Sequence, residues 1–471
     1  MKSQIRYVLL MLSMAITYNV YAKQISYNGL IFDLDVAYNE AVVVGVNDTV
    51  KCVTIPSTVS WDGIEYNVTS IQLYAEGSSM EYIIIPSSVT SINSELPNSL
   101  KSVRFEDGKE YLGISEKTFS KCEAITYIYI GRNIQGNNLF DCPLLESLEI
   151  GNNVTRLENI ISNVRFKNFN IPSNILYLDC SFSDCHFDNF IFDYSDEDIK
   201  TGYRVESYST GGWVDKKKLK PLLTADIDTL TICRNILFTN ITPFDSYFKK
   251  VKIAKNVQFL GSSAFQLCTI DSLSIEYSSD TLNLKSYALS CRSISSLHLN
   301  RNLSDSTVFR YEYLLRNVTI GDSIYNIPNE AFKGCTNLNY LSIGRNVNQI
   351  GINAFESCHR IDTVISYQPI PPIIYSNTFQ SYHSVLIVPN GTLETYKNAD
   401  YWNRFYEIKE IDTTSDSTTG ITDIITDKNV NNNDVVIVYN LNGVKLPINR
   451  RYQLSSLPHG IYIVNGVKQS L

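Results

Sequence analysis

The residue types that most often carry out chemistry are dispersed along this sequence. The five histidines occur singly, at His186, His298, His359, His383 and His459. None of them belongs to an H-E-x-x-H metal site, and there is no G-x-S-x-G elbow, P-loop or C-x-x-C pair. Those sites depend on ligands or reacting groups at fixed spacing. We therefore predict that the protein is not an enzyme and that it holds no cofactor or metal ion.

Two carboxylate arrangements keep other chemistry open. The run Asp193–Asp198 is acidic, but a calcium loop needs ligands at alternating positions around a glycine-bearing turn, and that order is absent. We interpret the run as a solvated loop. The paired carboxylates of a glycosidase meet in space and not in sequence, so a carbohydrate-active enzyme stays an alternative.

Cysteine is the one reactive residue with regular spacing. Six of the ten cysteines share one position of a repeating pattern, namely Cys122, Cys142, Cys268, Cys291, Cys335 and Cys358. Equivalent residues of stacked strands lie about 4.8 Å apart with parallel side chains, whereas a disulfide needs converging Cβ vectors. We predict a column of reduced, buried thiols that pack as small hydrophobic groups. Cys180 and Cys185, within one repeat, stay candidates for a pair.

The repeat that spaces these cysteines is clearest near Phe332, which returns as Phe355 after 23 residues. Each unit contains Leu-x-x-Leu-x-Ile, whose last two apolar residues alternate as in a strand, followed by a turn and another aliphatic residue. The last strand residue recurs at Ile55, Ile85, Phe105, Ile130, Ile150, Ile171, Phe192, Ile232, Ile253, Ile275, Leu299, Ile320, Ile343, Ser366 and Val388. This period predicts a right-handed leucine-rich-repeat solenoid of short parallel strands, in the α/β class but leaning to mostly β.

The solenoid, residues 53–388, lies within a longer order of segments. We predict a signal peptide over residues 1–22, an N-terminal β cap over 23–52, a C-terminal cap over 389–411, a polar linker over 412–420 and a β-rich tail over 421–471. The signal peptide follows from a basic start, a short apolar run and the small residues of Val20-Tyr21-Ala22. The long step from Phe192 to Ile232 holds either a degenerate repeat or an irregular insertion at about 193–229.

Two short patterns recur within the repeats. Residues 85–92 follow I-P-x-S-V-T-x-I, and residues 331–338 follow A-F-x-x-C-x-x-L. In these patterns, and in Leu386-Ile387-Val388-Pro389 near the end of the array, the chain resembles the BspA-like leucine-rich-repeat proteins of bacterial surfaces. The resemblance covers about residues 27–411 and is weakest between Phe192 and Ile232. It implies a secreted protein that binds host matrix, host cells or other bacteria.

The tail has a resemblance of its own. Residues 439–443 and 457–464 are similar to the C-terminal sorting segments of type IX-secreted Bacteroidetes proteins. That resemblance implies a sorting or anchoring module. The segment is shorter than the usual sorting domain, so a plain β appendage stays an alternative.

In place of a catalytic site, the repeats present a surface. The strand residue between two buried aliphatic residues points outward, and stacking of the repeats joins these residues into a stripe. The stripe varies while the buried set stays aliphatic, which is typical of a scaffold that presents a binding face. The predicted candidate binding face consists of Tyr82, Arg104, Tyr127, Tyr129, Glu149, Lys252, His298 and Tyr340.

The net charge of the chain limits the classes of partner that it can bind. The formal net charge of −8 argues against nucleic acid and anionic membrane, and no stretch after the signal peptide is apolar enough to insert in a membrane. We therefore predict a non-enzymatic, secreted, cell-surface binding or adhesion protein with a protein partner. Tyrosine rings also stack on sugars, so a carbohydrate-binding accessory protein with a glycan partner is the second interpretation. A structural spacer on the cell surface is the third.

Overall fold

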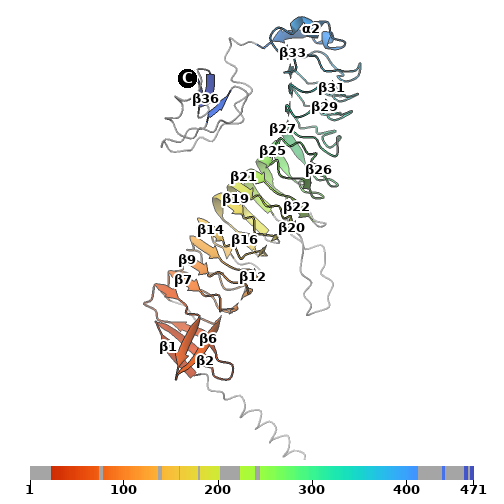
Figure 1. The fold of residues 1–471 in the computed structure, drawn as a ribbon. Helices are drawn as coiled ribbons and strands as arrows, with labels where there is room; N and C mark the ends of the chain where they lie inside the picture. The colour runs from red at the N-terminus through yellow and green to blue at the C-terminus, as the bar shows by residue number, and fades with distance from the viewer. Residues whose placement is uncertain are drawn as a thin grey trace, which may run out of the picture. The chain divides into compact units, whose positions relative to one another are not determined.

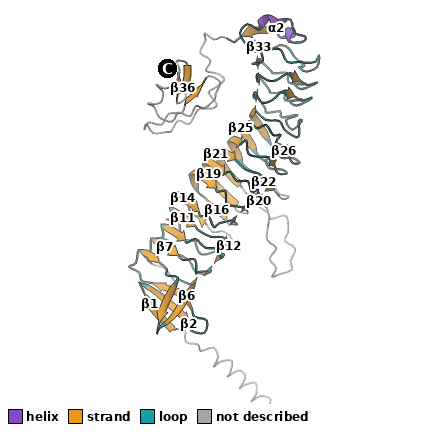
Figure 2. Ribbon diagram, viewed as in Figure 1, coloured by secondary structure: helices purple, strands orange, loops and turns teal. Residues whose placement is uncertain are grey.

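The computed structural model describes residues 23–73, 78–135, 140–158, 160–178, 181–201, 223–238, 244–411, 438–440, 461–464 and 467–470. The chain divides into two units, residues 1–410 and residues 411–471. The predicted signal peptide, the predicted linker, Cys180 and most of the tail lie outside the described residues. The described part is nearly all β (Figure 2), and its helices are α2 (Leu393–Lys397) and the 3-10 turn η2 (Trp402–Arg404). In the described ranges, no helix has the length and apolar character that a membrane crossing requires.

The first unit is a solenoid whose turns stack their strands into a parallel sheet (Figure 1). One segment of this sheet contains β4 (Cys52–Thr54), β7 (Tyr82–Ile85), β9 (Ser102–Phe105), β11 (Tyr127–Ile130) and β14 (Ser147–Ile150). The other contains β13 (Phe140–Asp141), β16 (Ile160–Ser162), β17 (Arg165–Ile171), β19 (Ser181–Phe192), β21 (Leu223–Ile232), β23 (Tyr247–Ile253), β25 (Thr269–Ile275), β27 (Ser293–Leu299), β28 (Asn317–Ile320), β30 (Tyr340–Ile343), β32 (Thr363–Ser366), β33 (Val385–Val388) and β34 (Glu407–Glu410). The predicted solenoid of short parallel strands is confirmed.

The register of the sheet matches the repeat positions expected from the sequence. In the first segment Ile85, Phe105, Ile130 and Ile150 lie side by side on successive strands. In the second segment the same holds from Ile171 to Ser366. Phe192 of β19 pairs directly with Ile232 of β21. The long step between these two residues is therefore one turn with an insertion, and not two turns.

A second series of very short strands follows the first corner of each turn. It contains β8 (Ser91–Ile92), β10 (Leu112–Ile114), β12 (Ile134–Gln135), β15 (Arg156–Leu157), β18 (Tyr177–Leu178), β20 (Ile199–Thr201), β22 (Ile236–Phe238), β24 (Phe259–Leu260), β26 (Asn283–Leu284), β29 (Asn326–Ile327) and β31 (Gln349–Ile350). Neighbouring members pair in parallel within three separate groups, which end at β12, β26 and β31. Within the segment predicted as an insertion, residues 199–201 and 223–229 thus belong to β20 and β21, and residues 202–222 lie outside the described residues.

Both ends of the solenoid are covered, which keeps terminal strand edges away from other chains. At the N-terminal end, β1 (Lys23–Tyr27), β2 (Leu30–Asp35) and β3 (Glu40–Val46) form an antiparallel sheet, and β5 (Thr58–Trp61) pairs with β6 (Ile64–Ile71). At the other end, the buried Trp402 donates a hydrogen bond from Nε1 to the Pro372 carbonyl at 2.7 Å. In the second unit, β35 (Val438–Asn440), β36 (Ile461–Val464) and β37 (Val467–Ser470) pair antiparallel.

The predicted cysteine column lies inside the solenoid. Cys122, Cys268, Cys335 and Cys358 are buried free cysteines, Cys142 is also buried, and Cys291 is partly exposed. The thiols of Cys335 and Cys358 donate to the carbonyls of Phe309 and Phe332 on the preceding turn, each at 3.2 Å. Glu312 takes the cysteine position between Cys291 and Cys335, and burial raises the pKa of its carboxyl to about 7. Burial likewise raises the pKa of the Cys122 and Cys268 thiols to about 12.

We expect these thiols to be unreactive toward an alkylating reagent in the folded protein, because thiolate is the nucleophile and burial suppresses it. The exposed Cys52 is the internal control and should react without denaturant. Intact mass after alkylation gives the number of cysteines that have reacted. It is measured with and without denaturant, and always without reductant. If most of the six column cysteines still failed to react in denaturant, they would be disulfide-bonded and the stacking argument would be wrong.

Three arginines are buried inside the turns without a carboxylate hydrogen-bonded to them in the described residues. Arg132, Arg234 and Arg301 are each at most 1% exposed. Arg132 donates to the carbonyls of Ser87 and Pro86 at 2.7 and 2.8 Å, two turns earlier in the array. Arg234 makes the same pair of bonds to Ser173 and Pro172, both at 3.0 Å. Each guanidinium therefore ties together turns that are not adjacent.

Candidate binding face

The strand face is the set of outward-pointing side chains on the two sheet segments described above, β4 to β14 and β13 to β34. It contains all eight predicted site residues. Arg104, Tyr129 and Glu149 lie side by side on β9, β11 and β14. Tyr127 is two residues before Tyr129 and occupies the neighbouring column, which also contains Tyr82 of β7. The structure therefore brings these five residues together on the first segment of the sheet.

Hydrogen bonds and ring contacts hold this first group in place. The guanidinium of Arg104 lies 3.9 Å from the centre of the Tyr129 ring. The Tyr129 hydroxyl donates to Asp107 Oδ1 at 2.8 Å, and the Tyr127 hydroxyl donates to Glu149 Oε2 at 3.0 Å. Partial burial, and then the hydrogen bonds to these carboxylates, raise the pKa of both tyrosines, so they stay neutral donors at neutral pH.

The other three predicted residues lie on the second segment of the sheet. Lys252 and His298 belong to β23 and β27, with Ser274 of β25 between them in the same column. Burial, and then the nearby Lys250, lowers the pKa of His298, which favours a neutral imidazole. Tyr340 of β30 lies in the next column. The eight residues thus form two groups along the face and do not converge on one point.

Between the two groups lies a polar cluster that the sequence analysis missed. One ligand atom each from His186, Asp188 and Asp228 lies within 4.8 Å of the others. Imidazole and carboxylate are donors that divalent transition metals accept. Here Asp188 Oδ1 is 3.3 Å from His186 Nε2, and Lys249 Nζ is 2.7 Å from Asp228 Oδ1. The lysine already supplies a positive charge to the cluster.

Two features hid these residues in the sequence. Asp228 falls in the stretch interpreted as an insertion, and both β19 and β21 carry two consecutive outward residues between buried ones. In β19 the outward pair is Asp188-Asn189, between the buried Phe187 and Phe190. Strict alternation predicts one outward residue there. The spacing of Phe187 and Phe190 is the sequence signal that could have revealed these residues. The two phenylalanines are three residues apart, where strict alternation predicts two.

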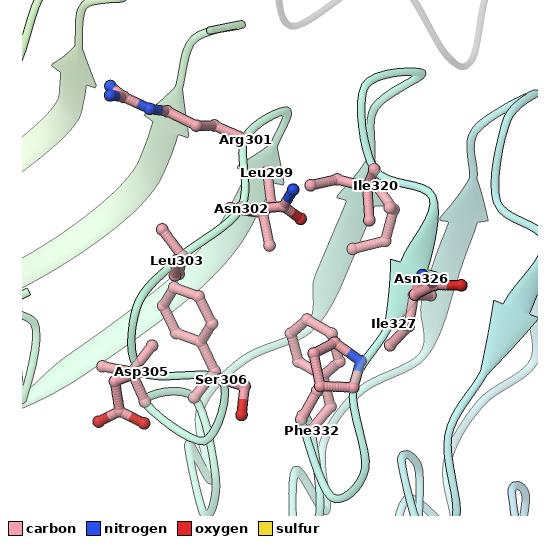
Figure 3. A pocket seen from close by; sticks show the side chains of 15 residues that line it. Leu299, Arg301, Asn302, Leu303, Asp305, Ser306, Ile320, Asn326, Ile327 and Phe332 are labelled. Atoms are coloured by element: carbon pink, nitrogen blue, oxygen red, sulfur yellow. The ribbon is translucent and has the colours of Figure 1, made fainter. Parts of the chain in front are cut away.

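A pocket of about 450 Å³, including its open mouth, lies away from the strand face (Figure 3). It is located where the second series of strands is interrupted, between Leu303 and β29. Its wall is mostly apolar and includes Ile320, Ile327 and Phe332, and the Arg301 side chain extends away from it (Figure 3). Among the described residues that line it, Asp305 is the one carboxylate.

The chain was compared with known proteins. A model of the BspA-type leucine-rich-repeat region matches residues 67–199, 227–307 and 305–429, with six copies of the repeat. No curated protein matches.

Solved structures with detectable likeness include two leucine-rich-repeat proteins and a vaccine antigen. A leucine-rich-repeat protein from Bacteroides ovatus is 16% identical, with coverage of 77% of this chain and 99% of that chain and a TM-score of 0.28. A leucine-rich cell surface protein from Faecalibacterium prausnitzii is also 16% identical, covering 87% and 99%, with a TM-score of 0.24. The pneumococcal vaccine antigen PcpA is 12% identical, covering 83% and 98%, with a TM-score of 0.23.

Proposed function

The chain belongs to the BspA-type leucine-rich-repeat family, and from that premise we propose that it is a secreted, surface-displayed protein that binds a protein partner through its strand face. The observation that carries this proposal is the network of Arg104, Tyr127, Tyr129 and Glu149. Arginine and tyrosine are the residue types that most often dominate protein interfaces. Here they are held by a hydrogen-bonded sheet, so little side-chain entropy is lost when a partner binds.

The same network favours a protein over a sugar at this group. A sugar ring stacks on the open face of an aromatic ring, but Arg104 lies over one face of Tyr129. The hydroxyls of Tyr127 and Tyr129 are already bonded to carboxylates. The group presents the charged side chains of Arg104 and Glu149 together with the rings of Tyr127 and Tyr129. That combination suits a partner with its own hydrogen-bonding and ionic groups.

We expect that replacing Tyr127 and Tyr129 together by alanine weakens binding to the partner at least tenfold, about 1.4 kcal/mol. The partner is first identified by screening the purified protein against extracellular-matrix proteins, host-cell surface proteins and a glycan array. The affinity is then measured by surface plasmon resonance. The loss is expected because both rings and the side chains that they position are removed from the face.

The matched control is the double change of Tyr127 and Tyr129 to phenylalanine, which keeps both rings and removes the hydroxyls. It should retain more affinity than the alanine variant, and thermal unfolding should show that both variants fold. Affinity that survives the alanine variant but collapses on deletion of residues 202–222 would place the binding element in the insertion. Selective binding to the glycan array through these residues would contradict a protein partner.

We also propose that residues 1–22 direct export and that residues 421–471 sort or anchor the chain at the cell surface. Support comes from the basic and apolar start of the sequence and from the separate second unit at its end. Deletion of residues 421–471 should leave the thermal unfolding of the solenoid unchanged and abolish antibody labelling of intact cells of the native host. Undiminished labelling would reduce the tail to a β appendage.

A further inference from the structure

Three side chains that can bind a metal ion come from β19 and β21, which are neighbours in the sheet (Figure 1). His186 and Asp188 lie two residues apart on β19, with the buried Phe187 between them, so both side chains point outward. Asp228 of β21 follows the buried Ile227, which pairs with Phe187. The register therefore places Asp228 beside Asp188, and the buried residues fix the backbone that carries all three side chains.

The side-chain atoms of these residues converge. Each residue offers one ligand atom, and the three atoms lie within 4.8 Å of one another. His186 Nε2 is 3.3 Å from Asp188 Oδ1. Bonds of about 2.0–2.1 Å from zinc to nitrogen or oxygen place neighbouring ligands of a tetrahedral site about 3.3–3.4 Å apart. His186 and Asp188 thus already have the separation of two ligands of one ion, and rotation of the Asp228 side chain would bring its carboxylate to the same point.

The charge of the two carboxylates is only partly balanced by their surroundings. Asp188 and Asp228 are side by side on adjacent strands, where like charges destabilise a sheet. Among the described residues, His186 is the one group within ion-pair distance of Asp188. Lys167 lies beside Asp188 on β17, but no ion pair joins these two residues in the described part of the chain. A dication between the two carboxylates would remove their repulsion.

Lys249 is the cation that a metal ion would displace. Its Nζ is 2.7 Å from Asp228 Oδ1, and its side chain is 59% exposed. An exposed ion pair of this kind contributes little to stability, because water and salt screen it. A divalent ion bonded to the carboxylate has twice the charge at a shorter distance. The pKa of Lys249 is raised by the hydrogen bond to Asp228 and then by the charges of Asp228, Asp188 and Asp271, so Asp271 is a further carboxylate near the released ammonium.

We propose that His186, Asp188 and Asp228 bind a divalent transition-metal ion such as Zn²⁺, in exchange for the contact with Lys249. One imidazole with two carboxylates favours such ions over Ca²⁺ and Mg²⁺, which prefer oxygen ligands. Three protein ligands leave at least one coordination position for water or for a donor group of another molecule. The proposal replaces the absence of a metal predicted from the sequence. The site is separate from the network proposed to bind a protein, so either proposal can fail without the other.

The test is titration of Zn²⁺ into the full mature chain by isothermal titration calorimetry, in a buffer that does not chelate metals. The wild type should bind Zn²⁺ more tightly than Ca²⁺. His186→Ala and Asp228→Asn should each weaken Zn²⁺ binding at least tenfold, because each removes a ligand. Lys249→Gln should strengthen it at least threefold, because the competing ammonium is gone. His359→Ala, which removes an exposed histidine elsewhere in the array, should leave the affinity unchanged.

Thiolate is also a zinc ligand, and Cys52 is exposed, so a second readout identifies the donor atoms. The Co²⁺ complex should show visible absorption without the near-ultraviolet charge-transfer band of sulfur ligation. Thermal unfolding should show that each variant folds. The proposal is overturned if the wild type binds no Zn²⁺, if the His186 and Asp228 variants bind it undiminished, or if His359→Ala weakens binding equally. Weaker binding by Lys249→Gln, binding of Ca²⁺ as tight as that of Zn²⁺, or a sulfur band in the Co²⁺ spectrum would contradict it as well.

Discussion

Replacing Phe332 by alanine is expected to lower the free energy of unfolding by about 3–5 kcal/mol, because it removes a fully buried ring from a continuous stack. Phe332 is 1% exposed. Its ring lies parallel to those of Phe309 and Phe355, with centre distances of 6.0 and 5.5 Å and interplanar angles of 3° and 6°. The stack continues from Phe355 to Phe379 at 5.1 Å. Chemical denaturation of the wild type and the variant measures the difference.

Two comparison variants show what the loss consists of. Phe332→Leu keeps most of the side-chain volume and leaves a smaller cavity than Phe332→Ala. It should therefore lower the free energy of unfolding by less than the alanine change does. Tyr325→Ala removes an exposed ring from the same part of the array and should change stability by under about 0.5 kcal/mol. A loss under 1 kcal/mol for Phe332→Ala would place the ring at the surface and refute the stacked core.

The regular part of the fold was predictable from the sequence, because each turn repeats one set of packing constraints. A residue that must be buried in every turn leaves a period, and that period located Ile85, Ile253 and Ile343 at equivalent points of the sheet. The stack at Phe332 and Phe355 follows from the same period. Side chains that repeat in sequence are neighbours in space, so no long-range information was needed.

The turn between β19 and β21 shows where periodicity fails. Its insertion doubles the spacing from Phe192 to Ile232, although the two residues are neighbours in the sheet. The sequence distance contains no signal that separates one enlarged turn from two ordinary turns. Asp228 was missed for this reason, whereas His186 and Asp188 were missed because β19 departs from strict alternation.

The candidate binding face was predictable as positions but not as contacts. Alternation placed Arg104 and Tyr129 in one outward column, and the structure has them on adjacent strands. That Arg104 covers the Tyr129 ring, and that Asp107 accepts from its hydroxyl, depends on side-chain torsions beyond the repeat pattern. The proposal of a protein rather than a glycan as partner for this group rests on these contacts.

The burial of the arginines could not be predicted from the local sequence motif alone. Gly131-Arg132-Asn133 and Gly344-Arg345-Asn346 have the same three residue types, yet Arg132 is buried and Arg345 is exposed. The difference lies in the residues that follow. After Arg345, both Val347 and Ile350 are buried, whereas after Arg132 the second-series strand begins at once with Ile134. The turn of Arg132 is shorter, and its buried guanidinium donates to the carbonyls of Ser87 and Pro86.

Arg234 has the same arrangement, with Ile236 of β22 two residues later, and gives the second large expected effect. Its replacement by methionine should lower the free energy of unfolding by about 2–4 kcal/mol, because the buried carbonyls of Pro172 and Ser173 lose charged donors at a cost of about 1–3 kcal/mol each. Methionine fills a similar volume and removes the cost of burying a charge, which limits the loss. Burial lowers the pKa of Arg234 to about 10, which is the direction expected of a guanidinium removed from water.

The matched control for Arg234→Met is Arg345→Met, which changes the same residue type at an equivalent point after its strand. Because Arg345 is exposed, its replacement should change stability by under about 0.5 kcal/mol. Urea denaturation of both variants gives the comparison directly. Equal and small effects would mean that water satisfies the Pro172 and Ser173 carbonyls once the arginine is gone. A loss confined to Arg234→Met would establish that this guanidinium holds together turns two repeats apart, which no pair of adjacent strands can do.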